Sequence, residues 1–390
     1  MLKSCSKNWK YYATCGLVQD ENHRISDFQT KTFLNTPKQQ HPPSTKITPF
    51  SVNFHIPENS SKNNTSEYEI CETDKNLVAR RGNKIHISIK FNRGYKIEFD
   101  DMFLVFSYVT GNIIPEFSPT RVNGTLVRLK VKEELERETQ AEKEGEVSDS
   151  EEEANGENWF AELENFDEEM NEILVSVQIP FECVIGKWKL SIECTSECTV
   201  ENTAAADSET EKNHLTSKFD CPTPLYIIFN PYSFKDQTFL PDPLHRKEYL
   251  ESEVGLIYRG SPENRSSKTW NYQQFDMGIL EASINCLLEN EQIKNRPFSN
   301  ISKLAKPEFV TRILSNAVHK SILVGNWSGE YKKGKSPLSW NGSGGIIKNS
   351  VESGAPTKFG QCWVFSGVVT TVCRSLGVPC RSVTGRGLKI

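Results

Sequence analysis

The sequence predicts an α+β protein in which a strand-rich part comes first and a helical part follows. Segments with apolar residues at every second position are concentrated before residue 205, and this alternation is typical of half-buried strands. After about residue 206 the apolar residues recur at helical spacing, which indicates helices packed on a core. A chain of 390 residues with 36% hydrophobic residues is long enough for two or three domains.

Residues 1–46 come before the first strand pattern. This stretch is polar and ends in repeated Gln and in Pro37, Pro42 and Pro43, so it offers little apolar surface to bury. We therefore expect a flexible tail over residues 1–46.

Residues 47–205 contain three clear strand patterns. The apolar positions are Ile85, Ile87, Ile89 and Phe91 in the first, Ile173, Val175, Val177 and Ile179 in the second, and Trp188, Leu190 and Ile192 in the third. Residues two apart in a strand point to the same face, so each set predicts one buried face. Several such strands in one region predict a β-sandwich.

An acidic insertion separates two of these strands at about residues 133–172. It contains 18 acidic and two basic residues, and its centre reads EGEVSDSEEE. Like charges repel and the few apolar residues cannot drive collapse, so we expect a disordered loop. The insertion has either no specific task or a regulatory one, in which phosphorylation of Ser148 or Ser150 adds negative charge.

Composition excludes several classes of protein. The net charge is -5 and the basic residues are not gathered beside a binding motif, which argues against a nucleic-acid partner. Eleven scattered cysteines fit reduced thiols, and Cys194 and Cys198 lack a second pair of zinc ligands. No stretch is apolar enough to cross a bilayer, and the first residues lack the apolar core of a secretory signal. We expect a cytoplasmic protein, whose extracellular release would need a route without a signal peptide.

Two helices are expected in the second part of the chain. One carries a stripe of Ile279, Leu280, Ile284, Leu287 and Leu288 after Asp276, and the other begins at Pro307 and carries Phe309, Val310, Ile313, Ala317 and Val318. Both stripes are most simply the core faces of packed helices.

A third helix is expected from Cys362 to Leu376. Its apolar residues are Val364, Phe365, Val368, Val369, Val372 and Leu376, and Gly377 and Pro379 follow as stop signals. Cys362 would lie in the first turn, where free backbone N–H groups and the helix dipole favour a thiolate. This makes Cys362 a candidate nucleophile, whereas Cys373 and Cys380 are expected to be buried and inert. We expect a strand over Cys380–Thr384.

The stretch FGQCWVFSGVVTTVCRSLGVPCRSVT, from Phe359 to Thr384, resembles the active-site segment of the transglutaminases, the protein-glutamine gamma-glutamyltransferases, and is closest in wording to arthropod members. Other family-like motifs are Val324–Trp327, Ser336–Trp340, Leu225–Pro231, Arg80–Gly82 and Phe91–Arg93. The resemblance covers roughly residues 47–384 without the insertion. It implies an N-terminal immunoglobulin-like β-sandwich over residues 47–205, followed over 206–390 by the first part of a papain-like catalytic core that is incomplete at its C-terminal side.

The resemblance also implies roles for site residues. Cys362 would be the nucleophile and, through its backbone N–H, an oxyanion donor, and Trp327 would be the second oxyanion stabiliser. Trp340 and Trp363 would be structural, and Gln361 would help to hold the turn before the nucleophile.

Two parts of the family pattern are missing from this sequence. The triad His and Asp follow the cysteine in the family, whereas all seven histidines here precede Cys362, and Gly385–Ile390 replaces the expected continuation. We interpret this as a premature end, which would leave Val368, Val372 and Val383 uncovered. Animal members depend on calcium, but only His319, Lys320 and Ser321 stand where the family has an acidic loop, so calcium is implied only for a full-length form. We assign no metal ligand or cofactor-binding residue.

The expected function is the joining of protein glutamine to lysine through a Cys362 thioester, with protein substrates as partners. The alternative is a catalytically inactive scaffold or regulatory fragment whose β-sandwich binds partners. A cysteine protease shares the Cys-Trp context but transfers the acyl group to water, and the upstream β-sandwich argues against it.

Overall fold

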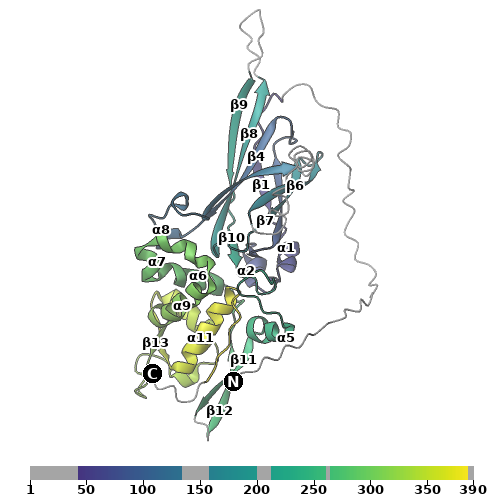
Figure 1. Cartoon of the computed structure of the whole chain (residues 1–390). Helices are drawn as coiled ribbons and strands as arrows, with labels where there is room; N and C mark the ends of the chain where they lie inside the picture. The colour runs from purple at the N-terminus through teal and green to yellow at the C-terminus, as the bar shows by residue number, and fades with distance from the viewer. Residues whose placement is uncertain (1–42, 134–157, 200–211, 261–263, 385–390) are drawn as a thin grey trace, which may run out of the picture. The chain divides into compact units, whose positions relative to one another are not determined.

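The structure is a computed structural model that describes residues 43–133, 158–199, 212–260 and 264–384 (Figure 1). Most of the expected flexible tail, the acidic centre of the insertion with Ser148 and Ser150, and residues 385–390 lie outside the described residues. Within them a β-domain precedes a mainly helical core domain, so the predicted α+β class is confirmed.

Among its described residues, the β-domain contains ten strands and two short α-helices. They are β1 (Pro49–Asn53), α1 (Ile56–Lys62), α2 (Glu69–Thr73), β2 (Leu77–Arg80), β3 (Lys84–Phe91), β4 (Asp100–Tyr108), β5 (Leu126–Glu133), β6 (Phe160–Asp167), β7 (Glu172–Gln178), β8 (Gly186–Thr199), β9 (Lys212–Asp220) and β10 (Leu225–Ile228). Hydrogen bonds connect them in the order β1-β3-β7-β6-β5-β4-β8-β10-β2, with β9 paired to β8. The pairs β5–β6 and β2–β10 are parallel, and the others are antiparallel.

The three predicted strand faces are buried. In the antiparallel pair β3–β7, Ile87 lies opposite Val175 and Ile85 lies opposite Val177. These side chains share one hydrophobic core with residues of β4 and β8, including Trp188. Two groups of strands that cover a common core are the arrangement expected of a β-sandwich.

The insertion is shorter than expected. Phe160–Asp167 is strand β6, which pairs with β7 and, in parallel, with β5. Phe160, Ala161 and Leu163 are buried there, because these few apolar residues face the core although the surrounding sequence is acidic. The expected disorder up to residue 172 is therefore wrong for this strand.

The expected boundary at residue 206 is also wrong. β9 pairs with β8, and β10 lies between β8 and β2 in the sheet of the β-domain. All four residues of β10 are buried, since strands flank it on both sides. β10 opens the family-like segment Leu225–Pro231 and completes the β-domain, and the core domain begins after Ile228.

The core domain contains seven α-helices and four short strands among its described residues. They are α5 (Pro243–Arg246), β11 (Val254–Gly260), β12 (Arg265–Asn271), α6 (Ile279–Glu289), α7 (Glu291–Asn295), α8 (Pro297–Asn300), α9 (Pro307–Ala317), β13 (Leu323–Gly325), α10 (Gly344–Ser353), β14 (Thr357–Gly360) and α11 (Cys362–Ser375). Short 3-10 or π-helical turns occur in both domains. The β-domain contains η1 (Gly111–Ile113) and η2 (Pro119–Arg121), and the core domain contains η3 (Lys247–Glu251), η4 (Ile301–Ala305), η5 (Val318–Ile322) and η6 (Pro337–Ser339).

The predicted helices are confirmed. The stripe on α6 is buried, as is that on α9 except for the half-buried Phe309. Helix α11 ends one residue before the expected Leu376, and Gly377 follows with a φ of +83°. A Cβ at Gly377 would lie 2.4 Å from the Phe229 carbonyl oxygen, so glycine allows this close approach to the segment that follows β10.

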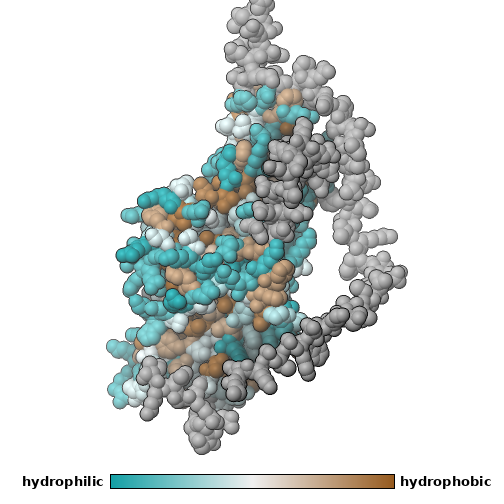
Figure 2. All heavy atoms as spheres, in the orientation of Figure 1, coloured by the Kyte–Doolittle hydropathy of each residue, from teal (hydrophilic) through white to brown (hydrophobic). Residues whose placement is uncertain are grey.

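Two expectations about the end of the chain are wrong. Val368 and Val372 are fully buried, because α11 packs against α6 and α9, and of the three valines only Val383 is exposed. Residues 380–384 form no strand; the Cys380 N–H donates to the Tyr249 carbonyl instead. On the face shown in Figure 2, hydrophobic residues form several small patches rather than one continuous surface.

Two buried arginines join the β-domain to the core domain. Arg81 binds both carboxylate oxygens of Asp236 and donates to the Ala305 carbonyl at 2.7 Å. Arg80 donates to backbone carbonyls, among them that of Phe229 at 2.8 Å. Gly82 follows because a Cβ there would collide with the Phe181 ring. The motif Arg80–Gly82 therefore forms the joint between the two domains.

Candidate active site

A short parallel pair of strands places the two predicted site residues at one edge. β13 and β14 pair in parallel, with Leu323 opposite Thr357 and Gly325 opposite Gly360. Trp327 and Cys362 each follow the end of their strand by two residues. Because the carboxyl ends of parallel strands meet at the same edge, Trp327 and Cys362 lie at the same end of this pair. We call the end formed by residues 325–327 and 360–362 the nucleophile edge.

Cys362 is the first residue of α11 and its side chain is exposed. Every other cysteine in the described part of the chain is buried or half-buried. The helix bonds begin with the backbone N–H groups of Val364 and Phe365, which donate to the Gln361 carbonyl. The Cys362 N–H lies in the first turn and therefore has no acceptor inside the helix. Sulfur and backbone donor are thus presented by the same residue.

Trp327 is 63% exposed and is held by one face of its indole. The ring lies against Gly325, where a Cβ would approach within 2.5 Å, and stacks on Phe365 with ring centres 6.5 Å apart and planes at 9°. Its N–H donates to no acceptor among the described residues. Phe365 was expected only as an apolar residue of the helix; its position three residues after Cys362, on the same helix face, was the available signal.

Two other tryptophans of the core domain donate their N–H groups to acceptors within the protein. The Trp340 N–H donates to the Phe359 carbonyl at 2.8 Å, and the Trp270 N–H donates to Ser343 Oγ at 2.8 Å. Trp363 is buried and meets Trp270 edge to face. These positions agree with structural roles for Trp340 and Trp363.

Gln361 connects the two sides of the nucleophile edge. Its Nε2 lies 3.4 Å from the Asn326 carbonyl oxygen and 3.3 Å from the Tyr331 hydroxyl. The Asn326 N–H donates in turn to the Gly360 carbonyl at 3.0 Å. Gln361 therefore links the turn before Cys362 to the segment that carries Trp327, and sequence reasoning had not identified Tyr331 as its partner.

The far end of α11 is anchored to both domains. The Tyr68 hydroxyl from the β-domain donates to the Ser375 carbonyl at 2.9 Å, and Ser283 of α6 bonds to the Ser375 hydroxyl at 2.8 Å. The buried Arg374 donates to three carbonyls, those of Glu248, Ser252 and Cys380. These bonds fix the axis of the helix that presents Cys362.

The other two cysteines of this region differ from their prediction in one respect. Cys373 is buried, and hydrogen bonding to Cys380 together with burial raises the pKa of its thiol. Cys380 is only half-buried, and the hydrogen bond from Cys373 lowers the pKa of Cys380 against the opposing effect of burial. Cys380 is therefore not simply an inert core thiol.

The histidines do not assemble a triad with Cys362 in the described residues. The exposed His319 stacks on Phe365 at 5.6 Å between ring centres, so it touches the aromatic pair beside the nucleophile edge. His55 bonds to Ser88, His86 contacts Glu164, and His245 stacks on Tyr249. Within the described ranges no histidine is hydrogen-bonded to Cys362.

Calcium ligands do not gather around the turn where the family has an acidic loop. Val318–Ile322 forms η5, and Lys320 pairs with Glu291 at 3.0 Å. Over the described ranges, no group of three or more His, Cys, Asp or Glu side chains is placed to hold a metal ion. These residues do not fit a calcium site, and we derive no chemical step through the metal.

Comparisons with known proteins support the family resemblance at both ends of the chain. The model of the transglutaminase family matches residues 50–195, and that of the transglutaminase-like superfamily matches residues 330–389. The second match contains Cys362 and the segment after Trp327. None of the helices in the described ranges is long and apolar enough to cross a membrane.

Curated relatives include arthropod proteins, as expected. The hemocyte protein-glutamine gamma-glutamyltransferase of Tachypleus tridentatus is 29% identical over 91% of this chain and 42% of its own length. Annulin of Schistocerca americana is 29% identical over 85% of this chain and 38% of its own length. Protein-glutamine gamma-glutamyltransferase 6 of Homo sapiens is 30% identical over 85% of this chain and 41% of its own length. The chain thus spans less than half the length of these relatives.

A solved structure shows the same fold. Red sea bream transglutaminase superposes with a TM-score of 0.63 at 24% identity, over 85% of this chain and 42% of that one. Family models match both the β-domain and the segment around Cys362, and relatives named protein-glutamine gamma-glutamyltransferases match most of this chain. The chain belongs to the transglutaminase family.

Proposed function

We propose that this chain carries the nucleophile of a protein-glutamine gamma-glutamyltransferase, which joins glutamine and lysine side chains of protein substrates by isopeptide bonds. One observation carries the proposal: Cys362 is an exposed thiol on the first residue of a helix, at the same strand edge as Trp327. A buried structural cysteine would not combine exposure with a helix N-terminus.

The proposed reaction forms and breaks one thioester. The Cys362 thiolate attacks the γ-carbonyl carbon of glutamine, and the carbonyl oxygen becomes an oxyanion. The backbone N–H of Cys362 and the indole N–H of Trp327 are the proposed donors to it. As this adduct collapses, the amide nitrogen takes up a proton from water, the C–N bond breaks and ammonia leaves, so that the acyl group remains on Cys362 as a thioester. A lysine amine then attacks the thioester, loses a proton and displaces the thiolate, which leaves an amide.

Among the described residues, no histidine is hydrogen-bonded to Cys362 to accept or donate a proton in this reaction. His319 lies beside the nucleophile edge, but its ring is stacked on Phe365 rather than bonded to Cys362. This observation favours the second candidate, a scaffold in which the β-domain binds protein partners and the core has no turnover. The two candidate functions differ in whether the Cys362 thiol is acylated and then released in each turnover.

Two measurements on the purified 390-residue chain test the proposal. The first is the rate at which iodoacetamide modifies Cys362, followed by mass spectrometry of the peptide that contains it. The second is calcium-dependent uptake of a labelled primary amine into a glutamine-rich protein, by wild type and by Cys362→Ala. Rapid modification with amine uptake that the mutant loses supports the enzyme. Rapid modification without uptake supports the scaffold, and peptide cleavage alone supports a protease. Modification no faster than that of free cysteine contradicts the nucleophile assignment.

The proposal also includes a cytoplasmic location and a dependence on calcium. Nine cysteines of the described part of the chain are free thiols, which supports synthesis and action in the reducing cytoplasm. We propose calcium dependence only for a form of the protein whose ligands lie outside the described residues. Removal of calcium by a chelator, during the amine-uptake assay, tests this point separately from the reactivity of Cys362.

A further inference from the structure

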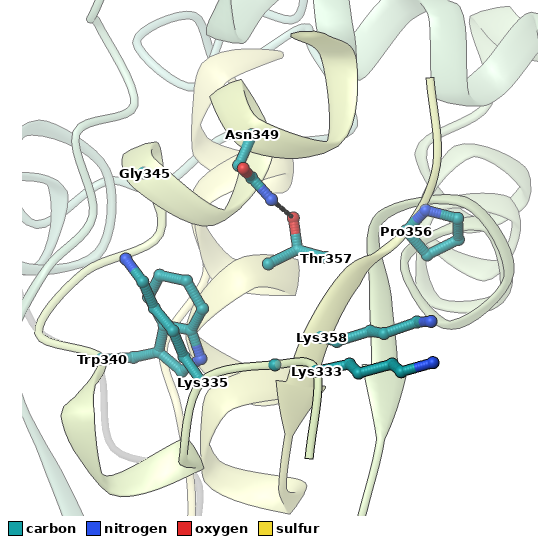
Figure 3. A pocket seen from close by; sticks show the side chains of 9 residues that line it. Lys333, Lys335, Trp340, Gly345, Asn349, Pro356, Thr357 and Lys358 are labelled. Carbon is teal, nitrogen blue, oxygen red and sulfur yellow. Dashed lines mark hydrogen bonds between the residues drawn. The ribbon is translucent and has the colours of Figure 1, made fainter. Parts of the chain in front are cut away.

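A pocket of about 410 Å³ lies beside strand β14, which leads directly into Cys362 (Figure 3). Three lysines line it: Lys333, Lys335 and Lys358. Its lining residues include no Asp or Glu. Because the pocket lies next to β14, it is a candidate contact site for a substrate that approaches Cys362.

Backbone contacts hold the three lysines together. The Lys335 N–H donates to the Lys358 carbonyl at 2.8 Å, and the Phe359 N–H returns a bond to the Lys335 carbonyl at 3.2 Å. Gly334 lies so close that a Cβ there would approach the Lys358 Cβ within 2.8 Å. The lysine segment is therefore fixed against β14 by its backbone, and its position does not depend on flexible side chains alone.

The lysine side chains are exposed and have no acidic partner among the described residues. Lys332, which precedes them, pairs with Glu330 at 3.4 Å, so the nearby carboxylate is already engaged. In Figure 3 the side chains of Lys333 and Lys358 point the same way, and Lys335 extends over the Trp340 ring. The Lys335 ammonium lies 4.8 Å from the centre of that ring. Ammonium groups only donate hydrogen bonds, so the pocket presents donors and positive charge.

The chemistry of the pocket selects a carboxylate-bearing ligand. A nucleotide would need an open aromatic face for its base, but Trp340 is only 8% exposed and Lys335 covers its ring. Exposed lysine ammonium groups suit an extended acidic segment, which needs several point charges rather than one enclosed phosphate site.

We propose that Lys333, Lys335 and Lys358 bind acidic residues that flank the reactive glutamine of the protein substrate. This inference rests on the proposed function, because it concerns the substrate of Cys362. Lys358 precedes Cys362 by four residues, which an extended chain spans in at most about 14 Å. A substrate strand rises about 3.3 Å per residue, so the acidic residues should lie about four positions from the glutamine.

Binding, measured without turnover, tests the inference. Fluorescein-labelled peptides carry one glutamine and, four positions away, three Glu, three Gln or three Lys. Fluorescence anisotropy with the 390-residue chain should show the acidic peptide bound about tenfold more tightly than the neutral one, since each exposed charge pair contributes a few-fold. The preference should shrink as salt is raised. Equal binding of the acidic and neutral peptides would overturn the inference.

Matched variants separate this pocket from the overall charge. Lys333→Gln/Lys335→Gln/Lys358→Gln should lose the acidic preference. Lys62→Gln/Lys75→Gln/Lys247→Gln removes the same charge from exposed lysines on other elements and should keep it. If both triple variants weaken binding equally, the effect is one of net charge and the inference is wrong.

Two further arms identify the ligand and the link to Cys362. Displacement of the acidic peptide by inorganic phosphate at equal charge concentration would indicate a small-anion site and contradict a peptide site. Cys362→Ala should retain the acidic preference, because the lysines bind without the thiol. If the preference is absent while iodoacetamide modifies Cys362 rapidly, the pocket inference fails and the proposed function stands.

Discussion

The joint between the two domains and the nucleophile edge differ in the burial and hydrogen bonding of their polar groups. At the joint, Arg81 and Asp236 are buried and each of the three guanidinium nitrogens of Arg81 donates to an acceptor. At the edge, the Cys362 thiol is exposed and the Trp327 N–H has no acceptor within the described ranges. A buried group without a partner is costly, so saturation at the joint serves stability. Unused donors in an accessible place are available to a substrate.

The same contrast separates two tryptophans that lie beside the strand pair β13–β14. Trp340 is buried beside β14, and its N–H is used by the Phe359 carbonyl. Trp327 follows β13, keeps 63% of its surface exposed and is supported from below by Gly325 and Phe365. The Trp340 N–H thus has a structural partner, whereas the Trp327 N–H has no acceptor among the described residues. Substitutions at both sites can break this comparison.

The largest effect is expected for Cys362→Ala. The variant should lose all rapid modification and all amine uptake, with an unchanged midpoint of urea unfolding, because an exposed side chain at a helix start carries little packing. The control is Cys380→Ala, whose half-buried thiol has a lowered pKa and is the competing target for iodoacetamide. If Cys380→Ala removes the rapid phase and Cys362→Ala does not, the two cysteines have been assigned the wrong roles.

The next largest effect is expected at the joint. Asp236→Asn leaves the Arg81 guanidinium buried without its charge partner, which should lower the free energy of unfolding by about 3–5 kcal/mol. The rate of Cys362 modification in the folded protein should not change. Urea unfolding measures the first quantity, and Asp101→Asn is the matched control, since its ion pair with Lys130 is exposed and is worth less than about 1 kcal/mol.

Acid should weaken the same joint. Burial would raise the pKa of Asp236, but the hydrogen bonds and charge of Arg81 outweigh it and lower the pKa. The stabilisation is therefore fully present above the unfolded pKa of about 3.9 and is lost as the pH falls through the lower folded value. Unfolding free energies between pH 7 and pH 3 should fall more in wild type than in Asp236→Asn. If the unfolding free energy fell equally with pH in wild type and in Asp236→Asn, protonation of Asp236 would not be the cause of the loss.

Periodicity predicted those parts of the fold that bury one face. The strand at Ile85–Phe91 and the helices at Ile279 and Pro307 followed directly from their apolar spacing. β6 was missed because its three buried residues, Phe160, Ala161 and Leu163, stand among acidic ones. β10 is apolar at every position, so its own sequence could not show that it pairs with β8 and β2 rather than with the core.

The candidate site was predicted in part from a sequence motif rather than from periodicity. Cys362 combined a helix start with a specific motif, and the structure places it at that start. Trp327 needed the family resemblance, because its nearness to Cys362 depends on pairing between strands more than thirty residues apart. No single segment of the sequence could predict the lysine pocket, since Lys335 lies outside the strands and is brought to Lys358 of β14 by backbone hydrogen bonds.

The third effect should appear in acylation. Trp327→Phe keeps an aromatic ring on Phe365 but removes the N–H, and loss of one oxyanion donor typically slows acyl transfer about 10²–10³-fold. The burst of p-nitrophenolate from p-nitrophenyl acetate at alkaline pH reports acylation of Cys362 without requiring a complete triad. Stability should be unchanged, because the indole N–H has no acceptor among the described residues. A burst as fast as that of wild type would remove Trp327 from the proposed mechanism.

The smallest effect is expected for the buried tryptophan. Trp340→Phe leaves the Phe359 carbonyl without its donor, which should lower the free energy of unfolding by about 1–3 kcal/mol. The acylation burst should remain near that of wild type, since β13 and the backbone bonds to Lys335 still hold β14. The pair Trp327→Phe and Trp340→Phe should therefore separate rate from stability. If Trp340→Phe slowed acylation as much as Trp327→Phe at unchanged stability, an unused indole N–H would not be what distinguishes the nucleophile edge.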